Sequence, residues 1–194
     1  MPKLGMEPIR KAALVKATIT EIGRVGSLDV TVSQIAKRAG MSSALAHHYF
    51  GSKDEIFLAA MRHVLTLYGA EVRGALAVAH GPEARIRAIL AASFSPGNFR
   101  REVVGAWLNF YVLAQTVPEA KRLLAVYQRR LRSNLVACLK PLAGARALPI
   151  ADGLGALIDG LYLREVLKSG PPDGAAAVAM ALAYLDAKLK DATP

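Results

Sequence analysis

The chain has 194 residues, of which 53% are hydrophobic, a mean hydropathy of +0.29 and a formal net charge of +10. It is long and apolar enough for a packed core, either as one domain or as a small head joined to a body. No apolar stretch reaches the roughly 18–20 residues of a membrane-spanning helix, and the charged start lacks the apolar segment of a signal peptide. The single cysteine, Cys138, excludes an internal disulfide, so we expect a reducing, cytoplasmic environment.

Apolar residues recur at helical spacing along almost the whole chain, and no alternating, strand-like run persists. Glycine and proline divide this pattern into about nine helices. We expect these helices at residues 7–25, 32–39, 42–49, 52–79, 83–94, 100–116, 119–140, 150–168 and from after Gly174 to about 190. Residues 141–149 are predicted to form a break between two of them. The sequence therefore predicts an all-α protein.

Residues 31–50 carry the most informative pattern, which is two short helices joined at Gly40. Thr31 or Ser33 can cap the first helix and Ser42 the second, because a hydroxyl oxygen can accept from the free amides of a first turn. Gly40 can adopt the positive φ of a tight turn between helices. This spacing predicts a helix-turn-helix unit.

The apolar side chains of this unit give it an inner and an outer face. Ile35, Ala36 and Leu45 are expected to pack inward, with Met41 between the helices. A helix of this kind can enter the major groove of DNA with its outer face. We expect that face to hold Ser43, Ala44, His47 and His48.

The chain then begins a longer helix, with Ser52 as its cap and Glu55 three residues on. Lys53 lies where a helix N-terminus can approach a phosphate of the DNA backbone, and the Tyr49 hydroxyl can reach that backbone as well. A three-helix core that binds no nucleic acid is the alternative, but the consistent spacing of caps, turn and exit favours DNA. The predicted DNA-binding residues are Thr31, Gln34, Ser42, Ser43, Ala44, His47, His48, Tyr49 and Lys53.

Residues from about 9 to 57 resemble the head of the TetR family of repressors, whose hallmark is this motif followed by Tyr-Phe-x-x-Lys, here Tyr49 to Lys53. Residues 1–11, 106–111, 129–135 and 157–162 resemble the choline-responsive repressors of glycine-betaine synthesis within that family. The resemblance implies a DNA-binding head at residues 8–68 and a ligand-sensing, dimerising body at residues 69–194. Some relatives carry a glycine just after the recognition-helix cap, where this chain has Ser43 and Ala44, so a shared operator is not expected.

We expect a homodimer, because one helix-turn-helix head reads too few base pairs to be selective. Small residues would let the 150–168 helix pack closely with the 119–140 helix in a two-fold four-helix bundle. Packing inside one protomer is the alternative, and the resemblance favours the dimer. The small residues are Ala151, Gly155, Ala156, Asp159 and Gly160.

Aromatic residues recur at helical spacing in the body, on two predicted helices and beside an acidic residue on a third. A quaternary ammonium ion has no hydrogen to donate, so ring faces and a nearby carboxylate hold it best. The resemblance implies choline as the effector that weakens DNA binding, and the predicted ligand-binding residues are Trp107, Phe110, Tyr111, Tyr127, Asp159 and Tyr162. An ordinary aromatic core is the alternative, with Asp159 paired to Arg164 or to a partner subunit.

The remaining patterns do not favour catalysis. His47, His48, His63 and His80 lack metal-binding spacing, and Cys138 has no zinc-ligand partner. We therefore expect no catalytic residue, metal or cofactor. The resemblance implies a repressor of choline-uptake and glycine-betaine synthesis genes. A repressor of this family that answers another lipophilic or cationic molecule, and a non-specific architectural DNA binder, are the alternatives.

Overall fold

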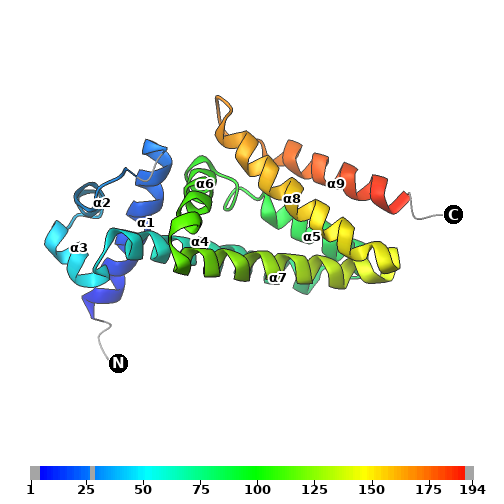
Figure 1. The fold of residues 1–194 in the computed structure, drawn as a ribbon, viewed down its shortest axis with the longest axis horizontal. Coiled ribbons are helices and arrows are strands. Elements are labelled where there is room, and N and C mark those ends of the chain that lie inside the picture. Colours follow the sequence, from blue (N-terminus) through cyan, green and yellow to red (C-terminus); the bar gives the residue numbers. More distant parts are fainter. Residues whose placement is uncertain (1–4, 27–28, 191–194) are drawn as a thin grey trace.

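The structure is a computed structural model that describes residues 5–26 and 29–190, in which every regular element is helical (Figure 1). The all-α prediction is therefore confirmed. None of the described helices combines the length and the apolar character needed to cross a membrane. The elements are α1 (Met6–Val25), α2 (Val32–Arg38), α3 (Ser43–Phe50), α4 (Lys53–Val78), α5 (Pro82–Ser93), α6 (Arg101–Thr116), α7 (Pro118–Ala143), the 3-10 helix η1 (Gly144–Arg146), α8 (Ala147–Val166) and α9 (Gly174–Lys190).

The predicted break at residues 141–149 is wrong, because α7 continues to Ala143 and α8 begins at Ala147. Pro141 lies in the last turn of α7, where the amide that proline lacks costs a single hydrogen bond. Pro149 lies in the first turn of α8, where an amide has no partner within the helix in any case. Gly144, with φ +52°, ends α7.

The helix-turn-helix head forms as predicted in its caps and turn. Thr31, rather than Ser33, caps α2, with its hydroxyl accepting from the Gln34 amide at 3.2 Å. The Ser42 hydroxyl accepts from the Leu45 amide at 3.2 Å, and Gly40 has φ +70°. These bonds satisfy amides that the start of each helix would otherwise leave free.

The inward face of α3 differs from the prediction. Ala46 is the fully buried residue of this helix, whereas Leu45 is only half-buried. Because α3 packs against α1, α2 and α4 of the same head, a methyl group is enough to fill the contact at Ala46. Ile35 and Ala36 of α2 are both fully buried, as predicted.

Figure 1 shows α4 running out of the head into the body, where it lies along α5 and α7. The helices α8 and α9 pack on one side of that layer, with α8 in extensive contact with α7. A buried carboxylate ties the head together: Glu21 of α1 accepts from Arg24 at 2.9 Å and from Arg38 of α2. The hydrogen bond from Arg24, together with Arg38, holds the Glu21 pKa below its usual value.

Helix α1 of the head also crosses α6 of the body at very short range. A Cβ atom on Gly23 would lie 2.4 Å from the Cα of Glu102, and one on Gly105 would lie 3.4 Å from the Cα of Gly23. The first distance is shorter than any real contact, so a residue other than glycine at 23 would force the two backbones apart. Head and body therefore touch backbone to backbone at this crossing.

We expect the Gly23→Ala substitution to destabilise the protein by about 1–3 kcal/mol, the usual cost of overpacking a tight contact. The matched control is Gly74→Ala, since a Cβ atom at this position of α4 would have no atom within 4 Å. Alanine there should be neutral or stabilise by about 0.5–1 kcal/mol, because glycine is a poor helix former. Urea unfolding measures both variants, and equal stabilities would contradict the proposed close contact.

Candidate DNA-binding face and effector site

The outer face of α3 carries Ala44, His47 and His48, all of them exposed, beside the half-buried Ser43. The His47 ring nitrogen Nδ1 donates to the carbonyl oxygen of Gly51 at 2.9 Å, because a carbonyl can only accept. That bond fixes the ring and leaves Nε2 as an acceptor on the neutral side chain. This face therefore presents exposed polar atoms, the kind of group that reads base edges in a major groove.

Three of the predicted DNA-binding residues have a structural task as well. The hydroxyls of Thr31 and Ser42 cap their helices, and Gln34 closes a capping box by accepting from the Thr31 amide at 2.7 Å. These side chains are exposed but are already bonded to their own helices through an oxygen. The amide nitrogen of Gln34 is the group among them best placed to serve another partner.

Tyr49 lies beside two basic residues of α1 that sequence reasoning did not select. Arg10 of α1 donates to the Tyr49 hydroxyl at 3.4 Å, and the Lys11 nitrogen lies 6.0 Å from the centre of the Tyr49 ring. The Lys53 nitrogen lies 5.4 Å from the centre of the Phe57 ring. Since 39 residues separate Arg10 from Tyr49, positive charge was the only sequence signal for these neighbours.

In the body, the predicted aromatic residues of α6, α7 and α8 form one cluster around Trp107. Its ring centre lies 4.7 Å from that of Tyr127, 5.8 Å from Tyr111, 6.0 Å from Phe110 and 6.3 Å from Tyr162. Trp107 and Phe110 are 4% and 1% exposed, so they belong to the interior of the cluster. Tyr111 is the most accessible ring of the five.

Asp159 joins this cluster by accepting a 2.8 Å hydrogen bond from the Tyr111 hydroxyl. In the described chain no ion pair links it to Arg164, the partner considered in the sequence analysis. Burial raises the pKa of the Asp159 carboxyl, and the bond from Tyr111 lowers it in part. Burial and the Asp159 charge together raise the Tyr111 pKa, which keeps the phenol protonated.

A cavity of about 430 Å³ opens beside Asp159 and is lined by Tyr111, Tyr162, the two glutamines Gln115 and Gln128, and apolar residues of α6 and α8. Its volume falls within the range of small-molecule sites. Tyr127 instead lines a second cavity, of about 670 Å³, between α4 and α7. The cluster therefore has an acidic, ring-lined opening at Asp159 and a separate opening at Tyr127.

Residues outside the prediction complete the cluster. Tyr68 of α4 packs edge-on against Tyr127 at 5.6 Å, with its hydroxyl 3.2 Å from the Ser93 hydroxyl. The Tyr162 hydroxyl donates to the backbone oxygen of Ser93 at 2.6 Å, which holds α8 against the end of α5. No other aromatic residue lies at helical spacing from Tyr68 on α4, so the sequence pattern did not identify it as a member of the cluster.

The small-residue face proposed for dimerisation is partly open. Cβ atoms on Gly155 and Gly160 would meet nothing within 4 Å, and Ala156 is exposed, whereas Ala151 is buried in the protomer. Large apolar side chains extend the same exposed face, namely Leu148, Leu163 and Leu167 at 45%, 46% and 76% exposure. An Arg132–Asp152 ion pair at 2.6 Å joins α7 to α8 beside it. A dimer at this face stays a prediction.

Sequence profiles match both parts of the chain. Residues 14–60 match the profile of the tetR family of bacterial regulatory proteins, and residues 82–190 match the C-terminal domain of BetI-type transcriptional repressors. The HTH-type transcriptional regulator BetI of Brucella suis biovar 1 (strain 1330) is 52% identical over 97% of this chain and 96% of its own length. That of Agrobacterium fabrum is 50% identical over 98% and 93%.

Solved structures share the fold. A transcriptional regulator from Pseudomonas aeruginosa PAO1 superposes with a TM-score of 0.80 and 28% identity over 97% of this chain and 93% of its own. A transcriptional regulator from Saccharomonospora viridis, crystallised in complex with choline, gives a TM-score of 0.77 and 20% identity over 91% and 95%. These relatives are regulators, in agreement with the prediction that the chain is not an enzyme.

We expect Asp159→Asn to raise the stability of the ligand-free protein at neutral pH, because it removes a partly buried charge but keeps an acceptor for Tyr111. Since the Asp159 pKa is raised in the fold, this gain should shrink as acid protonates the wild-type carboxyl. Asp152→Asn is the control with opposite sign: the hydrogen bond from Arg132 lowers the Asp152 pKa, so its contribution is present near neutral pH and lost in acid. Urea midpoints across pH measure both, and a destabilised Asp159→Asn variant contradicts the assignment.

Proposed function

The chain belongs to the TetR family of bacterial regulatory proteins, with a BetI-type C-terminal domain, and we propose that it represses choline-uptake and glycine-betaine synthesis genes until choline binds. The observation that carries the proposal is the carboxylate of Asp159 beside the Trp107 cluster, at the edge of a ligand-sized cavity.

The head supplies the DNA-binding half of this function. The exposed face of α3 is proposed to read base edges, while Lys53 at the start of α4 and Arg10 of α1 contact phosphates. A second protomer would bring a second α3 to the next half-site, about 34–36 Å along the duplex. The net charge of +10 favours the approach to DNA but specifies no sequence.

The body supplies the sensor. Choline carries a permanent charge without an N–H donor, so it is proposed to lie against the ring of Tyr111 with Asp159 as its counter-ion. Tyr162 lines the same cavity and adds a second ring. A regulator of this fold that was crystallised with choline, and relatives named BetI, support this choice of ligand.

Coupling between the two halves is proposed to run through two helices. Helix α6 carries Trp107 and Tyr111 and also crosses α1 at Gly23. Helix α4 begins in the head at Lys53 and carries Tyr68 in the body. A ligand acts only if it favours one arrangement of these helices over another. A modest swing of α4 would change the distance between the two recognition helices and so prevent both from docking.

We expect choline to weaken binding to the chain's own upstream DNA by about 5–150-fold, the usual range of allosteric coupling. Asp159→Asn should weaken choline binding about tenfold or more, which corresponds to about 1.4 kcal/mol. Asp152→Asn, outside the cavity, should leave it unchanged. Titration calorimetry with choline and fluorescence anisotropy with operator DNA, at one fixed salt concentration, measure the two effects. Specific DNA binding that is indifferent to choline would exclude choline as the effector and keep the repressor.

The two kinds of head residue should respond differently to substitution. Lys53→Ala should weaken binding to specific and random duplexes alike. It should also make the binding affinity less dependent on salt, by the release of about one counter-ion fewer. His48→Ala should reduce the preference for operator over random DNA by about 1–3 kcal/mol if α3 reads bases. Binding measured over a range of salt concentrations separates the two. A loss of preference in Lys53→Ala, with none in His48→Ala, would contradict the proposed roles.

A further inference from the structure

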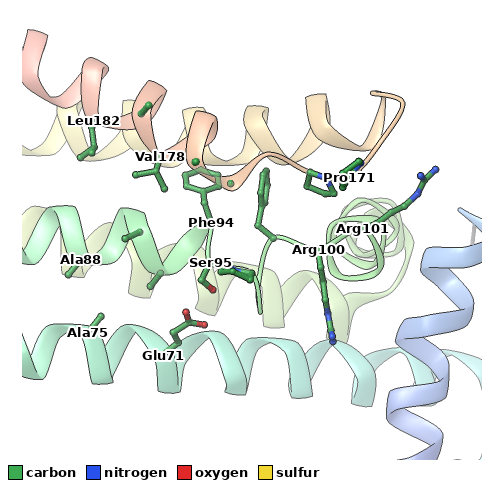
Figure 2. A pocket seen from close by; sticks show the side chains of 18 of the residues that line it. Glu71, Ala75, Ala88, Phe94, Ser95, Arg100, Arg101, Pro171, Val178 and Leu182 are labelled. Carbon is green, nitrogen blue, oxygen red and sulfur yellow. The ribbon is translucent and has the colours of Figure 1, made fainter.

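A trough of about 1270 Å³ lies between α4, α5 and α9, apart from the cavity beside Asp159 (Figure 2). Alanines of α4 and α5 line one side, including Ala75 and Ala88, and Val178 and Leu182 of α9 line the other. The two cavities share no lining residue, and the volume of the trough is about three times that of the cavity beside Asp159. Its walls are apolar and its volume exceeds what a molecule as small as choline can fill.

Two acidic residues line the trough: Glu102 in the first turn of α6, next to Arg101, and Glu71 on α4. Figure 2 shows the carboxylate of Glu71 pointing from α4 into the trough. The Asn98 side chain donates to it at 2.7 Å, and donates its other amide hydrogen to the Ala92 carbonyl at 2.9 Å. Because Asn98 is only 4% exposed, this amide holds the carboxylate in a fixed position.

Glu71 has no ion-pair partner within the described residues, although the chain has 25 lysines and arginines for 15 acidic residues. Two arginines lie at one end of the trough, but Arg101 points out of it and Arg100 extends along its end, away from the apolar walls (Figure 2). A positioned, unpaired carboxylate on an apolar surface is complementary to a cation that carries apolar groups.

Phe94 belongs to the same wall and is only 3% exposed, so it forms a packed part of that wall. Its ring is held edge-on by Phe99 at 5.0 Å, and the backbone oxygen of Phe94 would lie 2.4 Å from a Cβ atom on Gly174, so the start of α9 packs directly on this residue. We propose that the trough is a second ligand site, which binds an amphiphilic cation with its charged head at Glu71 and its hydrocarbon chain along the alanines.

The proposal does not rest on choline as the effector, because the trough and the Asp159 cavity use different residues. A neutral apolar molecule would gain nothing from Glu71, and a carboxylate amphiphile would be repelled by it. Ligand charge and ligand length therefore test the two parts of the site separately.

The experiment is titration calorimetry of the full chain with dodecyltrimethylammonium and with dodecanoate, both below their micelle concentrations. We expect the cation to bind once per protomer and the anion at least tenfold more weakly. Glu71→Gln should weaken binding of the cation by about tenfold. The control Glu119→Gln removes the same charge from α7 and should leave that binding unchanged. Equal binding of cation and anion, or no effect of Glu71→Gln, overturns the proposal.

A steric pair checks the hydrocarbon part and guards against an unfolded variant. Ala88→Leu fills the trough and should weaken the binding of dodecyltrimethylammonium by at least tenfold. Ala84→Leu should not, because Ala84 is exposed, lies one turn nearer the start of α5 and does not line the trough. Asp159→Asn should leave the affinity for this cation unchanged. A loss of binding in Asp159→Asn, without one in Glu71→Gln, would place the cation in the aromatic cluster and overturn the second site.

Discussion

The close crossing of α1 and α6 is the contact on which the placement of the head depends. Glycine at position 23 lets the two backbones meet, and Glu102 and Gly105 occupy the space that a side chain would need. Trp107 lies two residues after Gly105 on α6 and Tyr111 six residues after it, and both belong to the ring cluster. Because a helix is stiff over so short a length, a shift of these rings must also shift the surface on which α1 rests.

Two buried or half-buried acids show how the chain separates structure from function. Glu21 lies between two arginines that lower its pKa, so its charge stabilises the head. Asp159 has a phenol for a neighbour and a pKa raised by burial, so its charge costs stability in the ligand-free protein. An acid kept where its charge is unfavourable is typical of a binding site, because the missing positive charge can come with the ligand.

Local chemistry made much of this structure predictable. The caps at Thr31, Ser42 and Ser52 and the turn at Gly40 depend on neighbours within a few residues, and the sequence shows them directly. The break expected around Pro141 was wrong because a proline matters little within one turn of a helix end.

Tertiary contacts set the limit of that predictability. Which residue of α3 is buried, Ala46 or Leu45, depends on how closely α3 packs against the other helices of the head. The gathering of Trp107, Tyr127 and Tyr162 was expected from a resemblance, since no spacing relates three separate helices. The position of Glu71 depends on Asn98, which lies 27 residues away in another segment. The net charge of +10 likewise does not predict cavities that contain carboxylates. Charges more than about 8–10 Å apart are screened in salt, so each cavity responds mainly to the carboxylate nearest to it. One basic chain can therefore hold a polyanion at its head and a cation in its body, because each surface responds to the charges beside it.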